Sequence, residues 1–208
     1  MIRLWGRSTS TNVQKVLWFT EELKLDIEHR EVGGPFGGLD TPEFARLNPN
    51  RTVPVLEYDG CVIWESHAIL RFLANKNGAE SYYPGNANER SYDDRWLDWH
   101  SNVFWPPIRT LFLDGWRDKV FALNSPEASK LFARVAANVD LLETCRVGEA
   151  ESSGDARLSD LPLVIGLNRL LTVNPEFTLP PHVADWFARL TSRPGFSVVR
   201  DAERNLRI

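Results

Sequence analysis

The alternation of apolar and polar positions divides the chain into a first part with mixed strand and helix signals and a later part with helix signals only. Residues 2–5 form a short strand candidate, and residues 11–23 place apolar side chains near the 3.6-residue period of an amphipathic helix. A weak strand is expected over residues 27–32. The stretch GGPFGG follows, and its density of glycine argues against regular structure.

A β-hairpin is the strongest local prediction. The β-rich runs TVPVLEY and CVIWE are separated by Asp59-Gly60, a typical two-residue hairpin turn. Glu65-Ser66 then opens a helix that Gly78 is expected to end. The predicted apolar face of this helix consists of Ala68, Ile69, Phe72 and Leu73.

The remainder of the chain predicts helices. Residues 81–89 read as a linker, and a long aromatic-rich helical pattern over 90–118 is interrupted at Pro106-Pro107. Ser125-Pro126-Glu127 starts a further helix, with serine as the cap and proline in the first turn. Other helices are expected near 159–172, near 181–192 and after Pro194. The expected fold is therefore a small α/β domain (1–80), a linker (81–89) and an all-α domain (90–208).

Composition narrows the class of protein. The 208 residues are 43% hydrophobic and 25% charged, which is typical of a soluble globular protein. The net charge of −4 gives no basic surface for nucleic acid, and no apolar run is long enough to span a membrane. The N-terminus shows no secretion signal, and the two cysteines form no CxxC motif. A reduced, cytoplasmic protein without a metal site is expected.

Five short motifs together resemble the glutathione S-transferase superfamily, in its serine-type, theta- and phi-like bacterial branch. They extend over most of the chain: S-T-N-V-Q-K-V at 10–16, L-N-P-N at 47–50, V-P-V-L at 53–56, E-S-x-A-I at 65–69 and R-P at 193–194. The resemblance implies a thioredoxin-like domain that binds glutathione as co-substrate. It also implies a helical domain that supplies a pocket for the electrophile, and a homodimer.

Pro54 lies inside an otherwise good strand, where it cannot donate a hydrogen bond to a neighbouring strand. An edge strand or a bulge would accommodate it. The resemblance instead favours a cis bond between Val53 and Pro54, so that the Val53 backbone can pair with the backbone of glutathione, as an added strand would.

Glu65 and Ser66 have two interpretations. Serine at a helix start with a neighbouring acid is an ordinary helix cap. In the family that the motifs resemble, the pair holds the γ-glutamyl end of glutathione. Ser66 and the helix N-terminus suit its carboxylate, and Glu65 suits its ammonium. The glycyl carboxylate needs a cation, for which Arg51 is the candidate; a solvated surface arginine is the alternative.

Ser10 is the candidate that stabilises the thiolate of glutathione. Thr11 and Gln14 match a capping box, which predicts Thr11 as the helix cap and leaves Ser10 just outside the helix. The family motif S-x-N-x-x-[RK] matches Ser10, Asn12 and Lys15, and implies a hydrogen bond from Ser10 to the sulfur, with Asn12 as a second donor. Without the resemblance, Ser10 reads as a polar turn residue.

The energies are sufficient for this role. Lowering a thiol pKa of ~8.5 by roughly 2 units takes about 2.7 kcal/mol. A hydrogen bond to a charged group supplies ~1.5–3 kcal/mol, and a helix N-terminus adds ~0.3–1 kcal/mol. A general base is therefore not required.

Several other residues give weaker indications of function. Phe36 and Trp105 are the candidates for the electrophile pocket, whereas Trp96 and Trp99 read as core. The four histidines, at 29, 67, 100 and 182, lack metal-ligand spacing and read as structural or solvated. Family members cap a buried C-terminal helix with Ser or Thr three residues before its aspartate. Here Arg157 takes that position before Asp160, so either another residue caps the helix, with Ser159 as the candidate, or the helix start is held less firmly.

These residues predict a glutathione transferase that conjugates glutathione to small hydrophobic electrophiles. Glutathione-dependent ether cleavage, dehalogenation or isomerisation at the same site is one alternative. A non-catalytic ligand-binding protein of the same fold is another; it would keep Pro54, Glu65 and Ser66 but would not need Ser10.

Overall fold

The computed structural model describes residues 1–147 and 156–207, and the chain divides into two compact units. The first unit comprises residues 1–86 together with the C-terminal segment from Arg193, and the second comprises Ala87–Ser192. The sequence analysis assigned the C-terminal segment to the helical domain instead. Because that segment packs on the first helix, as described below, it groups with the N-terminal unit.

A mixed four-stranded sheet lies at the centre of the first unit. Its strands have the order β2-β1-β3-β4, with β1 parallel to β2 and the other pairs antiparallel. Leu4, Val55 and Leu56 are fully buried in this sheet. The expected thioredoxin-like sheet is therefore confirmed. The strands are β1 (Ile2–Trp5), β2 (Glu28–Arg30), β3 (Val55–Tyr58) and β4 (Cys61–Trp64).

The hairpin turn between β3 and β4 is also confirmed. Asp59 and Gly60 both have positive φ, 46° and 86°, as a type I′ turn requires. Tyr58 pairs with Cys61 across the turn, so the loop contains two residues. The asparagine- or aspartate-glycine signal was sufficient here because it is purely local.

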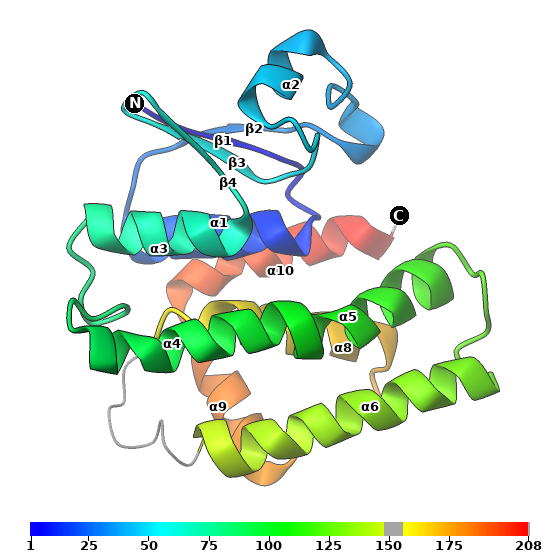
Figure 1. The fold of residues 1–208 in the computed structure, drawn as a ribbon. Coiled ribbons are helices and arrows are strands. Elements are labelled where there is room, and N and C mark those ends of the chain that lie inside the picture. The colour runs from blue at the N-terminus through cyan, green and yellow to red at the C-terminus, as the bar shows by residue number, and fades with distance from the viewer. Residues whose placement is uncertain (148–155, 208) are drawn as a thin grey trace. The chain divides into compact units, whose positions relative to one another are not determined.

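Helices cover this sheet on both sides. Figure 1 shows α1 and α3 together on one side of the strands and α2 on the other. The buried apolar side chains of α3 are Ile69, Leu70, Leu73 and Ala74, whereas Ala68 is exposed, so the predicted apolar face was partly wrong. The helices are α1 (Thr11–Glu22), α2 (Pro42–Leu47), α3 (Ser66–Lys76) and α10 (Ser197–Arg204), with 3-10 turns η1 (Gly34–Phe36), η5 (Pro194–Phe196) and η6 (Asn205–Arg207).

The sequence analysis missed helix α2. Thr41 caps it by accepting a hydrogen bond from the Phe44 backbone N–H at 3.2 Å, Pro42 occupies the first turn, and Glu43 follows. This Thr-Pro-Glu start is the same kind of signal as Ser125-Pro126-Glu127, which correctly predicted the start of a helix. The helix is short, so its periodicity gave no second indication.

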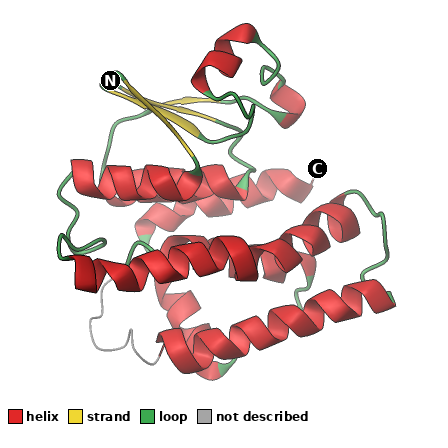
Figure 2. Cartoon of the chain, viewed as in Figure 1, coloured by secondary structure: helices red, strands yellow, loops and turns green. Residues whose placement is uncertain are grey.

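In the described residues of the second unit, the regular elements are helices joined by loops (Figure 2). The predicted cap of α6 is confirmed, because Ser125 accepts a hydrogen bond from the Ala128 N–H at 3.2 Å. The elements are α4 (Ala87–Trp99), η2 (His100–Phe104), α5 (Trp105–Thr110), η3 (Leu111–Arg117), α6 (Pro126–Leu142), η4 (Glu143–Val147), α8 (Asp160–Val173) and α9 (Pro181–Thr191).

The sequence analysis expected Pro106-Pro107 to interrupt the helix, but the helical path continues through both residues. The two prolines occupy the first turn of α5, where the missing N–H groups cost least. The preceding segment η2 has the wider π-helical hydrogen bonding. The helix therefore changes from π-helical to α-helical hydrogen bonding at the prolines and does not end there.

Buried charges hold the start of α8. Asp93, which is fully buried, accepts hydrogen bonds from the Ser159 hydroxyl (2.7 Å) and from Arg157 (2.7 Å). Asp160 accepts from the Arg157 backbone N–H at 2.7 Å and pairs with the buried guanidinium of Arg146. Ser159 is the cap residue, but its hydroxyl makes no capping hydrogen bond. The helix start is therefore fixed by ion pairs rather than by the expected serine cap.

The C-terminal segment is clamped to α1 by a second cluster. Arg193 donates to both carboxylate oxygens of Glu22, at 3.1 and 2.7 Å, and Tyr82 and Trp18 donate to the same group. Burial raises the pKa of Glu22, but these hydrogen bonds outweigh it and lower the pKa overall. Phe196 meets Trp18 edge-to-face with 5.0 Å between ring centroids. The C-terminal end of α1 is thereby fixed.

Replacing Arg193 by methionine should lower the free energy of unfolding by about 1.5–3 kcal/mol, because Glu22 loses its charged donor. Urea denaturation measures the change. Arg204→Met in α10 is the matched control: its ion pair with Asp201 is exposed and should be worth less than about 1 kcal/mol. The carboxylate of Glu22 has a lowered pKa, so the effect of Arg193→Met should be full at neutral pH and shrink in acid, as the pH falls through that lowered pKa. Equal losses in the two variants would contradict the clamp.

Candidate functional site

Ser10 lies at the start of α1, but its side chain does not cap the helix. It is the N-cap residue, with extended φ and ψ of −76° and 123°, and its side chain makes no capping hydrogen bond. The predicted Thr11 capping box is wrong, because Thr11 is already helical and Gln14 Nε2 donates to Glu203 at 3.1 Å instead. The helix therefore does not use the Ser10 hydroxyl.

The starts of α1 and α3 lie next to each other and share a hydrogen bond. Ser66, the first residue of α3, donates from its hydroxyl to Asn12 Oδ1 at 3.5 Å. The same oxygen accepts from Lys15 Nζ at 2.9 Å. The structure thus brings together Asn12 and Ser66, which the sequence placed on separate helices.

Lys15 and His67 lie behind this junction, and both are buried. Lys15 Nζ is 3.3 Å from His67 Nε2. Burial lowers the pKa of Lys15 to about 7, while the nearby Glu65 carboxylate partly opposes that shift. The sequence analysis quoted Lys15 only as a motif match and read His67 as structural or solvated. The spacing of three between Asn12 and Lys15 could have revealed that pair, whereas the contact with His67 required the fold.

Glu65 has an unfavourable backbone conformation. Its φ of 72° and ψ of 116° lie outside the regions that residues with a Cβ ordinarily adopt, and its side chain is exposed at the start of α3. Strain of this kind costs roughly 1–3 kcal/mol and is concentrated at functional sites. The residue predicted to bind the ammonium of glutathione therefore has a strained backbone, which lowers the stability of the fold.

The bond between Val53 and Pro54 is cis, as predicted. The paired residues of β3 begin at Val55, so Pro54 precedes the strand rather than interrupting it. Val53 lies against the loop that leads to α1: a Cβ added to Gly6 would come within 3.0 Å of Val53 Cβ and 2.5 Å of a Val13 methyl. Glycine is required at position 6 for this close approach.

Arg51 points to a different partner. Its guanidinium NH1 is 3.3 Å from Asp40 Oδ1, and both side chains are largely exposed. Its backbone also has a positive φ of 52°. The structure thus gives Arg51 a partner other than a ligand, and its predicted role toward the glycyl carboxylate stays a prediction.

Phe36 and Trp105 belong to different units. Phe36 is 55% exposed, in a loop whose four glycines all have positive φ and whose Gly34 backbone lies against the Arg7 side chain. Trp105 stacks on His100, with 6.1 Å between ring centroids and 8° between planes. The electrophile pocket that the sequence assigned to both residues stays a prediction.

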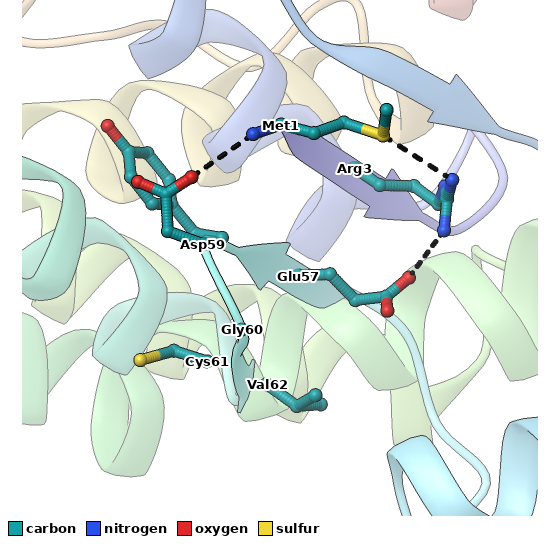
Figure 3. Close-up of a pocket in the computed structure, with 8 residues that line it drawn as sticks. Met1, Arg3, Glu57, Asp59, Gly60, Cys61 and Val62 are labelled. Atoms are coloured by element: carbon teal, nitrogen blue, oxygen red, sulfur yellow. Dashed lines mark hydrogen bonds and ion pairs between the residues drawn. The ribbon is translucent and has the colours of Figure 1, made fainter.

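Two hollows in the first unit contain none of the predicted site residues. Figure 3 shows the larger, of about 210 Å³, at the β3–β4 turn. Its charges are satisfied internally, since Arg3 pairs with Glu57 and the N-terminal ammonium pairs with Asp59. The second, of about 160 Å³, is lined by Trp5, by Phe44 and other residues of α2, and by residues of the loop before α2. Neither hollow contains Ser10, Asn12, Glu65 or Ser66.

Comparison with known proteins identifies the family. The sequence profile described as glutathione S-transferase, N-terminal domain, matches residues 9–76. Glutathione S-transferase GstB of Escherichia coli (strain K12) is 31% identical over 205 residues, which cover 93% of this chain and 95% of that protein. The chain therefore belongs to the glutathione S-transferase family of enzymes.

Solved structures agree with this family and with the fold. A theta class glutathione S-transferase from Xanthomonas axonopodis pv. citri, crystallised with glutathione bound, is 37% identical with a TM-score of 0.72, over 94% of each chain. Glutathione transferase F2 from Populus trichocarpa, at 19% identity, has a TM-score of 0.86 and covers 98% of this chain and 100% of its own. No helix in residues 1–147 and 156–207 combines the length and apolarity needed to cross a membrane.

Two substitutions at position 65 separate strain from binding. Glu65→Gly and Glu65→Ala both remove the carboxylate, but only glycine also removes the Cβ that disfavours the observed φ. The glycine variant should therefore be more stable than the alanine variant by about 1–2 kcal/mol in chemical denaturation. Both should bind glutathione more weakly than wild type. Equal stabilities would show that the backbone at Glu65 is unstrained.

Proposed function

We propose that the chain binds glutathione at the adjoining starts of α1 and α3, ionises its thiol through the Ser10 hydroxyl and conjugates it to small hydrophobic electrophiles. The observation that carries this proposal is the junction of the two helix starts, where Ser66 and Asn12 are hydrogen bonded to each other. The glutathione bound in the Xanthomonas relative supports the same ligand here.

The charges around the start of α3 complement the γ-glutamyl group, which carries both a carboxylate and an ammonium. The N–H groups of the first turn, together with the Ser66 hydroxyl, favour a carboxylate. The exposed Glu65 carboxylate, one residue earlier, favours the ammonium. On this proposal the Val53 backbone, which precedes the paired part of β3, hydrogen bonds to the backbone of the glutathione cysteine.

The thiolate is stabilised at the start of α1. Ser10 at the N-cap has a hydroxyl that the helix does not use, and the helix N-terminus adds its own positive potential. Asn12 is the second donor. A mechanism that uses a tyrosine hydroxyl would need a tyrosine near the end of β1. Trp5 occupies that place and donates a hydrogen bond to Glu57 at 2.7 Å. The free cysteines, Cys61 and Cys145, lie on β4 and η4, away from the start of α1 in the chain, and have no role in this scheme.

The thiolate can serve more than one reaction. Conjugation is the proposal, with Phe36 and Trp105 as the expected contacts of the electrophile and Arg51 as the candidate for the glycyl carboxylate. Ether cleavage, dehalogenation and isomerisation begin from the same thiolate. A binding protein without catalysis would keep the groups at α3 but would not depend on Ser10.

Ser10→Ala tests the catalytic role. Loss of a hydrogen bond worth ~1.5–3 kcal/mol should raise the pKa of the bound thiol by about 1–2 units and lower conjugation of an aryl halide near neutral pH by roughly 10- to 150-fold. The loss should diminish at alkaline pH, where the thiol ionises unaided. Steady-state kinetics across a pH series measures both effects.

Ser8→Ala is the matched control. Ser8 lies in the same loop, and its backbone N–H, which donates to the Glu31 carboxylate at 3.0 and 3.2 Å, is unaffected by the substitution. It should retain wild-type turnover. Undiminished activity in Ser10→Ala would remove the serine mechanism, whereas glutathione binding without turnover in the wild-type protein would favour the binding-protein alternative.

We also propose that the protein is a cytoplasmic homodimer. Strand β4 is at the edge of the sheet, and its Val62 and Trp64 side chains are 44% and 40% exposed. Exposed apolar residues on an edge strand are typical of an interface. Light scattering should give twice the chain mass of 23.7 kDa, and Trp64→Lys should lower that mass. A monomeric wild-type protein would contradict the dimer and leave the glutathione site unaffected.

A further inference from the structure

Lys15 is a buried cation beneath the proposed site. Only 3% of the residue is exposed, and it shares α1 with the fully buried Val13 and Val16. Burying an ammonium is costly unless its hydrogen bonds are satisfied. Its partners, Asn12 Oδ1 at 2.9 Å and His67 Nε2 at 3.3 Å, therefore indicate what this residue does.

The contact with Lys15 determines which way the Asn12 amide faces. The ammonium form of Lys15 only donates hydrogen bonds, so the amide atom beside it is the oxygen. Ser66 Oγ donates to the same oxygen at 3.5 Å. With Oδ1 held by two donors, the Nδ2 group is turned away from Lys15. Nδ2 donates to no protein atom in the described residues.

His67 restricts the charge at this position. An ammonium and an imidazolium 3.3 Å apart in a buried site would repel each other, so the pair carries at most one positive charge. The neutral imidazole then accepts at Nε2 from the Lys15 ammonium. Glu65 at the start of α3 is the nearby acid, whereas Glu203 of α10 is engaged by Gln14.

We propose that Lys15 is a positioning residue for the glutathione reaction: through Oδ1 it fixes Asn12, so that the Nδ2 group is presented to the glutathione sulfur. The inference rests on the proposed function. It makes Asn12 a preorganised donor to the thiolate, since a donor already held in place loses no rotational freedom when the thiolate forms. Lys15 acts through Asn12 and need not touch glutathione.

The role is tested by a double-mutant cycle. Lys15→Met removes the ammonium and keeps an apolar stem, Asn12→Ala removes the amide, and a third protein combines both. The readout is the acidic midpoint of kcat/KM for glutathione as a function of pH. Lys15→Arg is the conservative control, because it keeps a cation with donor groups and the family motif accommodates either basic residue.

Lys15→Met should raise that midpoint by about one pH unit, which is a loss of roughly 10-fold at pH values below it. At alkaline pH its kcat/KM should be within about 2-fold of wild type, and Lys15→Arg should restore most of the loss. Asn12→Ala should show the same shift, and the double variant should show no larger one, because both substitutions remove a single donor.

Two results would overturn the positioning role. An unchanged midpoint in Lys15→Met, with only stability or KM altered, would leave Lys15 a structural residue. A shift of equal size in the Asn12→Ala background would mean that Lys15 acts on the thiolate without Asn12. In either case wild-type protein would still bind and turn over glutathione, whereas failure of the proposed function would show as no glutathione binding by wild type.

A measurement on the wild-type protein removes any dependence on how the variants fold. The Asn12 side-chain amide resonances, assigned by their loss in Asn12→Ala, should shift on addition of glutathione. They should also exchange more slowly with solvent in the complex. Unchanged resonances at saturating glutathione would contradict the presentation of Nδ2 to the ligand.

Discussion

The hydrogen bonds of one buried ammonium hold together the two helix starts on which the site depends. Lys15 donates to Asn12 on its own helix and contacts His67 on α3, while Ser66 of α3 donates to the same Asn12 oxygen. Helix α1 is fixed at its other end by the Glu22–Arg193 cluster and by Phe196 against Trp18. The positions of Ser10 and Asn12 therefore follow from contacts made by residues far apart in the chain.

Most charged and dipolar groups around the proposed site favour a negatively charged ligand group. Two helix N-termini and one buried cation favour negative charge, and glutathione brings a thiolate and a carboxylate to such a place. The exposed acid Glu65 is the exception, and it suits the one cationic group of the ligand. The same residue has a strained backbone, with φ of 72°.

Local sequence signals predicted those parts of the structure that local interactions determine. The Asp59-Gly60 turn and the Ser125 cap needed only neighbouring residues. Thr41-Pro42-Glu43 carried an equally local signal for α2 that was overlooked. The cap of α1 was displaced by one residue, because Gln14 bonds to Glu203 rather than closing a capping box.

The remaining features could not be predicted because they depend on distant partners. The contact between Lys15 and His67 joins residues 52 positions apart, and that between Glu22 and Arg193 joins residues 171 apart. The buried pairing of Asp93 with Arg157, 64 positions apart, likewise replaces a serine cap that local rules favoured. Periodicity indicates which face of a helix is buried, but it does not identify the residue across the interface.

Thermal unfolding of the wild-type protein with increasing glutathione examines the binding on which every proposed role depends. A ligand that binds only the folded state at about 100 times its dissociation constant adds about 2.7 kcal/mol of stability. The melting temperature should therefore rise steadily with glutathione at millimolar concentrations, and Glu65→Ala should require more glutathione for the same rise. A melting temperature unaffected by glutathione would contradict the assignment of this site.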